Sequence, residues 1–261
     1  MVYIIWHDND YDFAKWVYEN SMLKDEEVIL KSVPKTNESN LLKEKFSEET
    51  DYDILPIIKL ATSDIIIQKV EKGNSKILFV SEFMTHTPQH DHVFQRVERI
   101  YNVSKEKIPV AFILPRNKVK FEKGTRDSYK EVKYGPNPLA VHTYLKTTII
   151  NQNATLMFFW PDREGYLKYD SKHQTAPKNE DQIAKWFDFL NESITKEDFK
   201  QIYKSKIVKE QLQFLEENFP LGKNKFFSVE YKDFISKFQE YYNLERVHIV
   251  STKEAIKTYN L

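Results

Sequence analysis

Residues 63–101 read SDIIIQKVEKGNSKILFVSEFMTHTPQHDHVFQRVERIY, and this stretch decides the fold. Two apolar runs, residues 65–70 and 77–84, flank the turn-rich sequence EKGNSK, and this pattern predicts a β-hairpin. An acidic residue lies near the outer end of each run, Asp64 before the first and Glu82 within the second. The hairpin therefore carries two carboxylates at the end that lies away from its turn.

The register of the hairpin determines whether these two carboxylates meet. A three-residue loop, 72–74, pairs positions whose numbers sum to 146, which makes Asp64 and Glu82 cross-strand neighbours with Cβ atoms about 5 Å apart. A two-residue loop, Gly73 and Asn74, puts the side chains on opposite faces unless Asp64 precedes the regular strand. Two carboxylates so close repel each other unless a cation lies between them, so the first register predicts a divalent-metal site.

The composition excludes several classes of chemistry. The 261 residues are 41% hydrophobic and 14% aromatic, enough for a sizeable core, and the absence of cysteine excludes disulfides, thiolate metal sites and a cysteine nucleophile. No apolar segment approaches the roughly 18 residues of a membrane span, and no signal peptide is visible, so we expect a cytoplasmic protein outside the membrane. With five glycines and no phosphate-binding glycine motif, the sequence disfavours a nucleotide cofactor.

Further strands and helices are predicted on both sides of the hairpin. Apolar segments at residues 2–6, 108–114 and 153–160 predict buried strands, and residues 93–101 have the apolar spacing of a helix. A second helix is predicted over residues 138–150, and its apolar stripe comprises Leu139, His142, Leu145 and Ile149.

This order of elements predicts an α/β (α+β) protein with a central mixed β-sheet flanked by helices. From about residue 178 the sequence changes to helical runs rich in Lys, Glu and aromatic residues. We therefore divide the chain into an α/β core, residues 1–177, and a mainly helical C-terminal region, residues 178–261. The two parts either form separate domains or belong to one.

The order of these elements resembles the PD-(D/E)XK nuclease fold of type II restriction endonucleases. In that order, an acidic residue precedes a hairpin, a second acidic residue lies on the next strand, and a helix and a buried strand follow. The matching letters are SD at residues 63–64 and EFM at residues 82–84, and the resemblance covers about residues 64–114. It implies a restriction-endonuclease-like fold in which Asp64 and Glu82 bind Mg²⁺. The metal then activates water to hydrolyse a DNA phosphodiester bond.

Two positions depart from the pattern of this family. Ser63 stands where the family often has Pro, and Met84 occupies the position of a lysine that positions or activates water. Lys69 on the neighbouring strand is the nearest lysine, but by the 146 rule it lies opposite Ile77, several residues from the second carboxylate. Polar groups after the hairpin are the other substitutes, so the predicted catalytic residues are Asp64, Glu82, His86 and Gln95.

The resemblance also implies that double-stranded DNA is the partner. Residues 116–133 hold seven basic and three acidic residues, and this basic segment is equally consistent with a solvated surface and with a phosphate-binding patch. The candidate DNA-binding residues are Arg96, Arg116, Lys118, Lys120, Lys123 and Arg126. A restriction enzyme that cuts palindromic sites is expected to be a homodimer, because two-fold DNA symmetry needs two equivalent active sites.

Two polar clusters and one ion pair offer alternative interpretations. The sequence THTPQHDH contains four possible zinc ligands: His86, His90, Asp91 and His92. One interpretation is a zinc hydrolase. The other is a polar loop in which Asp91 caps the next helix. The sequence HDND at residues 7–10 is more typical of a helix N-cap than of a metal site. In a non-catalytic module that binds nucleic acid or protein, Glu82 would instead form a buried ion pair with Arg96 or Arg99.

Overall fold

A computed structural model of the protein describes residues 1–8, 10–34, 46, 48–58, 63–84, 96–115, 118–123, 129–134, 136, 138–160 and 181–219. The chain divides into two compact units, Met1–Pro220 and Leu221–Leu261, and every described residue belongs to the first. Among the described helices, none has both the length and the apolar character needed to cross a membrane.

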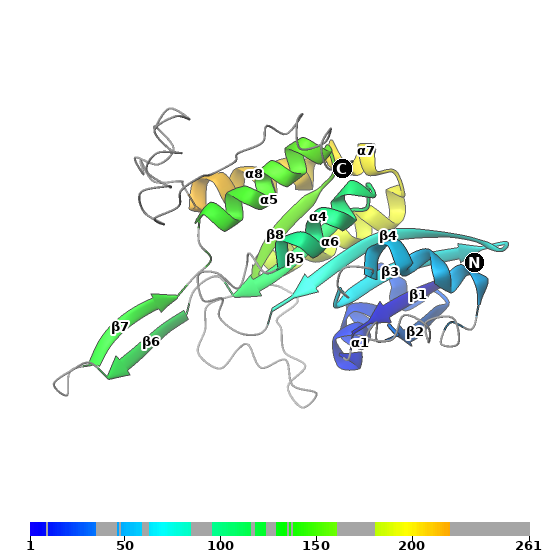
Figure 1. Ribbon diagram of the computed structural model, residues 1–261, viewed down its shortest axis with the longest axis horizontal. Helices are drawn as coiled ribbons and strands as arrows, with labels where there is room; N and C mark the ends of the chain where they lie inside the picture. The colour runs from blue at the N-terminus through cyan, green and yellow to red at the C-terminus, as the bar shows by residue number, and fades with distance from the viewer. Residues whose placement is uncertain are drawn as a thin grey trace, which may run out of the picture. The chain divides into compact units, whose positions relative to one another are not determined.

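A six-stranded mixed β-sheet forms the centre of the described unit (Figure 1). Its strands are β1 (Val2–His7), β2 (Val28–Ser32), β3 (Ile65–Glu71), β4 (Asn74–Phe83), β5 (Val110–Pro115) and β8 (Thr155–Trp160). They lie in the order β2-β1-β3-β4-β5-β8, and β3 is antiparallel to both of its neighbours. The remaining neighbours are parallel. The predicted mixed sheet is therefore confirmed.

Helices cover both faces of this sheet. The first face packs against α1 (Tyr11–Asn20) and α6 (Asp181–Lys196). The second face packs against the 3₁₀-helix η2 (Glu49–Ile54), α3 (Leu55–Ile58), α4 (Val97–Lys105) and α5 (Pro138–Asn151). The other described helices are η1 (Met22–Asp25), α7 (Phe199–Tyr203) and α8 (Lys206–Asn218). The flanking helices are thus confirmed, and α6 to α8 form the described part of the C-terminal region.

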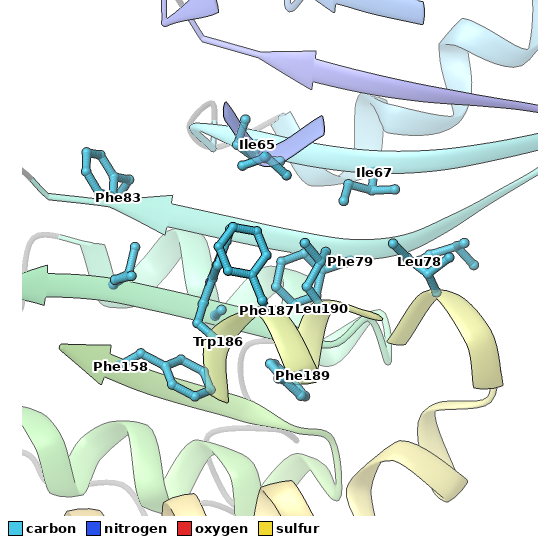
Figure 2. Packing of buried hydrophobic residues seen from close by; sticks show 14 of the residues in the cluster. Ile65, Ile67, Leu78, Phe79, Phe83, Phe158, Trp186, Phe187, Phe189 and Leu190 are labelled. Carbon is cyan, nitrogen blue, oxygen red and sulfur yellow. The ribbon is translucent and has the colours of Figure 1, made fainter. Parts of the chain in front are cut away.

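Aromatic side chains fill the core on the first face (Figure 2). Trp186 of α6 is fully buried, and its ring stacks on Trp16 of α1 with centroids 5.9 Å apart. Ile65 and Ile67 of β3 also face this core. Because side chains alternate along a strand, Ile66 faces the second core instead. The residue before β3, Asp64, therefore lies on the second face.

The β3–β4 hairpin forms, but its loop differs from both predicted loops. Glu71 pairs with Asn74, so the loop consists of two residues, Lys72 and Gly73. Both have positive φ, 51° and 79°, which is typical of the type I′ turn that matches the twist of two paired strands. At this end of the hairpin, paired positions sum to 145, as for Gln68 and Ile77.

A β-bulge then restores the register that brings the carboxylates together. Gln68 pairs with Ile77, whereas Ile67 pairs with Phe79, so Leu78 is left without a partner on β3. Beyond the bulge, paired positions sum to 146, as for Ile65 and Ser81. The predicted register is therefore confirmed beside the two acids, although the predicted loop is wrong.

Other predictions need correction. Strand β2 was not predicted, and neither was the antiparallel pair of β6 (Lys118–Lys123) and β7 (Tyr129–Tyr134) within the basic segment. Helix α5 lies where expected, but Ile149 of its predicted apolar stripe is 59% exposed, whereas Tyr144 is buried. The predicted domain boundary after residue 177 falls outside the described residues and stays a prediction.

Candidate functional site

The two predicted carboxylates lie together at the open end of the hairpin. Asp64 directly precedes β3, and its Oδ2 accepts a hydrogen bond of 2.6 Å from the backbone N–H of Phe83. Glu82 is the residue before Phe83 on β4, and its side chain is fully buried on the second face. The backbone of β4 therefore orients one carboxylate while the same strand presents the other.

Two arginines of the following helix neutralise this pair. Nη1 of Arg96, at the N-terminus of α4, lies 2.6 Å from Oε2 of Glu82 and 3.5 Å from Oδ2 of Asp64. Nη1 of Arg99, one helical turn later, lies 3.6 Å from the same Oε2 of Glu82. The Arg96 guanidinium thus bridges both carboxylates, and Arg99 contacts one.

Burial disfavours the ionised form of the Glu82 carboxyl group. It raises the pKa of Glu82 to about 7, and the neighbouring Asp64 charge adds to this, while Arg96 and Arg99 oppose it. Burial also raises the pKa of Asp64, against the lowering effect of the Phe83 N–H. A further cation at this position would favour the charged form of both groups.

One oxygen of the pair has no partner among the described residues. Oε1 of Glu82 is buried and accepts no hydrogen bond within the described part of the chain. A buried carboxylate oxygen usually has a donor or an ion beside it, because leaving it unpaired costs free energy. Carboxylate oxygens are the ligands that Mg²⁺ prefers, and Mg²⁺ is commonly held by one or two carboxylates together with water. Asp64 and Glu82 therefore fit a divalent cation.

Helix α5 adds a residue that the sequence analysis missed. Tyr144 is buried, and its ring stacks on Phe112, the β5 partner of Glu82, with centroids 5.6 Å apart. Burial and the charge of Glu82 raise the pKa of Tyr144, while Arg96 lowers it, so the phenol lies within the field of this ion cluster. A tyrosine on the buried face of a helix was the available signal, because its hydroxyl needs a polar neighbour.

The HDND sequence at the end of β1 has two roles. Asp10 caps α1, since its side chain accepts a hydrogen bond of 2.9 Å from the N–H of Phe13, which confirms the predicted N-cap. Asp8 lies beside the site: its backbone N–H donates to the carbonyl of Asp64 (3.3 Å), and its charge raises the pKa of Asp64. No group of three or more His, Asp or Glu side chains is placed to hold a metal ion among the described residues.

Lys69 does not lie where it could take the place of the lysine in the PD-(D/E)XK pattern. This residue pairs with Lys76, not with Ile77 as predicted, and its Nζ lies 2.6 Å from Oε1 of Glu197 near the turn of the hairpin. Met84 is buried in the second core and brings no polar group to the site. Four predicted site residues, together with Asp91, lie outside the described residues: His86, His90, His92 and Gln95.

Of the predicted DNA-binding residues, the structure brings Arg96 alone to the carboxylates among those whose side chains it describes. Strand β6 includes Lys118, Lys120 and Lys123, and the structure describes their backbone. Arg116 and Arg126 lie outside the described residues. Comparison with known proteins returns no matching protein-family model, curated protein or solved structure.

Proposed function

We propose that the protein is a Mg²⁺-dependent endonuclease that hydrolyses DNA phosphodiester bonds in the manner of a type II restriction enzyme. The observation that carries this proposal is the pair of Asp64 and the buried Glu82, in which Oε1 of Glu82 has no partner among the described residues. A site of this kind suits a divalent cation better than it suits a purely structural role.

The order of elements around the pair supports the same proposal. Asp64 precedes the hairpin, Glu82 lies on its second strand, and α4 then leads to β5, which is parallel to β4. This is the order of acid, hairpin, acid, helix and buried strand in which the chain resembles the PD-(D/E)XK nucleases. A restriction-endonuclease-like fold belongs to the proposal on this ground.

Each described residue of the site has a distinct task in the proposed reaction. The Phe83 N–H fixes the carboxylate of Asp64, and the burial of Glu82 keeps its oxygens away from bulk water. When bound, Mg²⁺ supplies positive charge to the scissile phosphate and lowers the pKa of a bound water. Arg96 adds a guanidinium that suits phosphate oxygens.

The wider proposal is that double-stranded DNA binds across this site and the basic strand β6. The lysines of β6 contribute positive charge, which favours binding to phosphates without selecting a base sequence. The two-fold symmetry of a palindromic site would call for a homodimer.

A specific observation also favours a second candidate, a non-catalytic module that binds nucleic acid or protein. In that interpretation Glu82 forms a buried ion pair with Arg96 or Arg99, and both contacts are present, at 2.6 and 3.6 Å. The unpartnered oxygen of Glu82 favours the nuclease over this module, because most buried polar atoms have a partner and a bound cation would supply one.

Incubation with phage and plasmid DNA in Mg²⁺ distinguishes the two candidates. We expect discrete fragments from the wild type, none in EDTA, and rates at least about 100-fold lower for Asp64→Asn and Glu82→Gln. The matched control is Glu71→Gln, which removes a half-exposed carboxylate from the turn end of β3 and should cut like the wild type. DNA binding without cutting supports the module, and equal cutting by all variants contradicts the site.

A further inference from the structure

The Arg96 guanidinium lies where a cation that bridges the two carboxylates would lie. The same nitrogen, Nη1, approaches Oε2 of Glu82 at 2.6 Å and Oδ2 of Asp64 at 3.5 Å. A divalent cation bound by both carboxylates needs lone pairs on these same two side chains. A metal that bridges the two carboxylates through these oxygens would therefore compete with the guanidinium for one position.

The charges of the site lead to the same competition. Two carboxylates face two guanidinium groups, those of Arg96 and Arg99, so the four groups are balanced when all are ionised. A divalent cation would leave these four groups with a charge of about +2, or about +1 when the neighbouring carboxylate of Asp8 is counted, and like charges at these distances repel where water is scarce. Departure of one guanidinium relieves the excess.

Arg96 is the arginine placed to leave. It precedes the first residue of α4, and its side chain makes no capping hydrogen bond there. Arg99 lies one turn inside the helix, and its Nη1 lies 3.6 Å from Oε2 of Glu82. Loss of the Arg96 contacts would leave Glu82 with Arg99 and with the incoming metal.

We propose that Arg96 is an exchangeable counter-ion: a divalent metal displaces its guanidinium from Asp64 and Glu82, and the released guanidinium binds a phosphate of the DNA. This inference rests on the proposed function. Its consequence is that metal and DNA bind cooperatively, because the metal frees a phosphate-binding group that the carboxylates otherwise hold. Guanidinium groups suit this exchange, since they pair with carboxylate and phosphate through the same geometry.

The competition can be measured without DNA and without catalysis. We expect Arg96→Met to bind Mn²⁺ about tenfold more tightly than the wild type in a calorimetric titration, since typical couplings between binding events are about 5- to 150-fold. Arg96→Lys retains a competing charge and should bind Mn²⁺ more weakly than Arg96→Met. Unchanged or weaker Mn²⁺ binding by a folded Arg96→Met protein would overturn the exchange.

The cooperativity is tested by DNA binding, with Arg99→Met as the matched control. We expect Ca²⁺ to tighten the binding of a fluorescent duplex by the wild type, with the DNA checked by gel for integrity. Arg96→Met should lose most of this gain, whereas Arg99→Met should keep most of it, because Nη1 of Arg96 bridges the two carboxylates and Arg99 lies farther from Glu82, at 3.6 Å. Equal gains in both variants would contradict the proposal.

A third measurement uses the wild type alone, so it does not depend on the folding of a variant. Phenylglyoxal modifies accessible arginines, and mass spectrometry follows the rate at Arg96. We expect Mn²⁺ to accelerate this modification, and an unchanged or slower rate would overturn the exchange.

The failure of the exchange can be told from the failure of the proposed function. If the wild type binds Mn²⁺ and Asp64→Asn does not, the metal site stands, and the Arg96 results alone decide the exchange. If neither protein binds Mn²⁺ and the wild type cuts no DNA, both proposals fall.

Discussion

The β3–β4 hairpin has an ion pair at each end, and the two pairs have the same length in different settings. Near the turn, Nζ of Lys69 lies 2.6 Å from Oε1 of Glu197, whose side chain is 32% exposed. At the open end, Nη1 of Arg96 lies 2.6 Å from Oε2 of Glu82, whose side chain is 0% exposed.

The contrast shows that burial, rather than distance, distinguishes the candidate site. Water solvates the carboxylate of Glu197, so its ion pair is of the surface kind that contributes about 1 kcal/mol or less. The ionised form of Glu82 is stabilised by protein groups in place of water. Burial raises the pKa of Glu82 to about 7 even with Arg96 and Arg99 beside it. A buried carboxylate in that condition is a candidate ligand for a cation.

The sharpest way to break this comparison is to remove the basic partner at each end. At pH 8 we expect Arg96→Met to lower the free energy of unfolding by about 3 kcal/mol, because Glu82 then keeps a poorly compensated buried charge. Lys69→Met should cost less than about 1 kcal/mol. Urea denaturation of both variants measures the two costs, and equal costs would remove the distinction between the two ends.

The pH dependence of the free energy of unfolding also tests the burial of the Glu82 carboxyl group. Because the pKa of Glu82 is raised in the folded protein, the folded state keeps a proton that the unfolded state loses above its ordinary value of 4.5. Stability from Glu82 is therefore lost as pH rises from about 4.5 to about 7.

Glu82→Gln removes this titration. Relative to the wild type, the variant should gain about 3 kcal/mol between pH 4 and pH 8, following about 1.4 kcal/mol for each pKa unit. Urea denaturation at both pH values measures the gain. Parallel curves for the two proteins would show that Glu82 ionises as easily in the folded protein as in the unfolded one.

A smaller loss of stability would show that the ion cluster of Asp64, Glu82 and Arg96 extends to Tyr144 of α5. Tyr144→Phe removes a hydroxyl within the field of Glu82 and Arg96, and we expect a loss of about 1 kcal/mol in the free energy of unfolding. Tyr101→Phe is the matched control, because Tyr101 is 41% exposed, and it should change stability very little. Equal losses of stability for the two variants in thermal or urea melts would show that the Tyr144 hydroxyl does not interact with the site.

An effect of about the same size is expected at the turn of the hairpin. Gly73 has φ of 79°, and an added Cβ would meet no atom within 4 Å, so Gly73→Ala should cost about 1 kcal/mol through backbone strain alone. Lys72 has φ of 51°, and Lys72→Gly should relieve a similar strain in part. Urea denaturation checks both signs, and a stabilising Gly73→Ala would contradict the type I′ turn.

The hairpin and the meeting of its acids could be predicted, but the turn could not. The apolar runs and the outer acids define two strands, and a sum of 146 happens to describe the pairing beside Asp64 and Glu82. The bulge at Leu78 has no composition signal of its own. In the structure, the bulge places the side chains of two consecutive residues, Leu78 and Phe79, in the first core.

The partners of the acids were harder to predict because they come from other elements. Tyr144 lies 62 positions after Glu82 in the sequence, and only the packing of α5 on the second face brings them together. The contact of Glu82 with Arg96 fits a structural ion pair in a non-catalytic protein, and the same contact lies at the position of the candidate metal. Sequence spacing distinguishes neither role, since both require only opposite charges.

The most direct test of the metal site is anomalous diffraction from crystals soaked in Mn²⁺. We expect a peak between Asp64 and Glu82, about 2.1 Å from an oxygen of each, with the Arg96 guanidinium moved away from both. A structure with no peak at this pair, and with Nη1 of Arg96 still on Oε2 of Glu82 at saturating Mn²⁺, would contradict it.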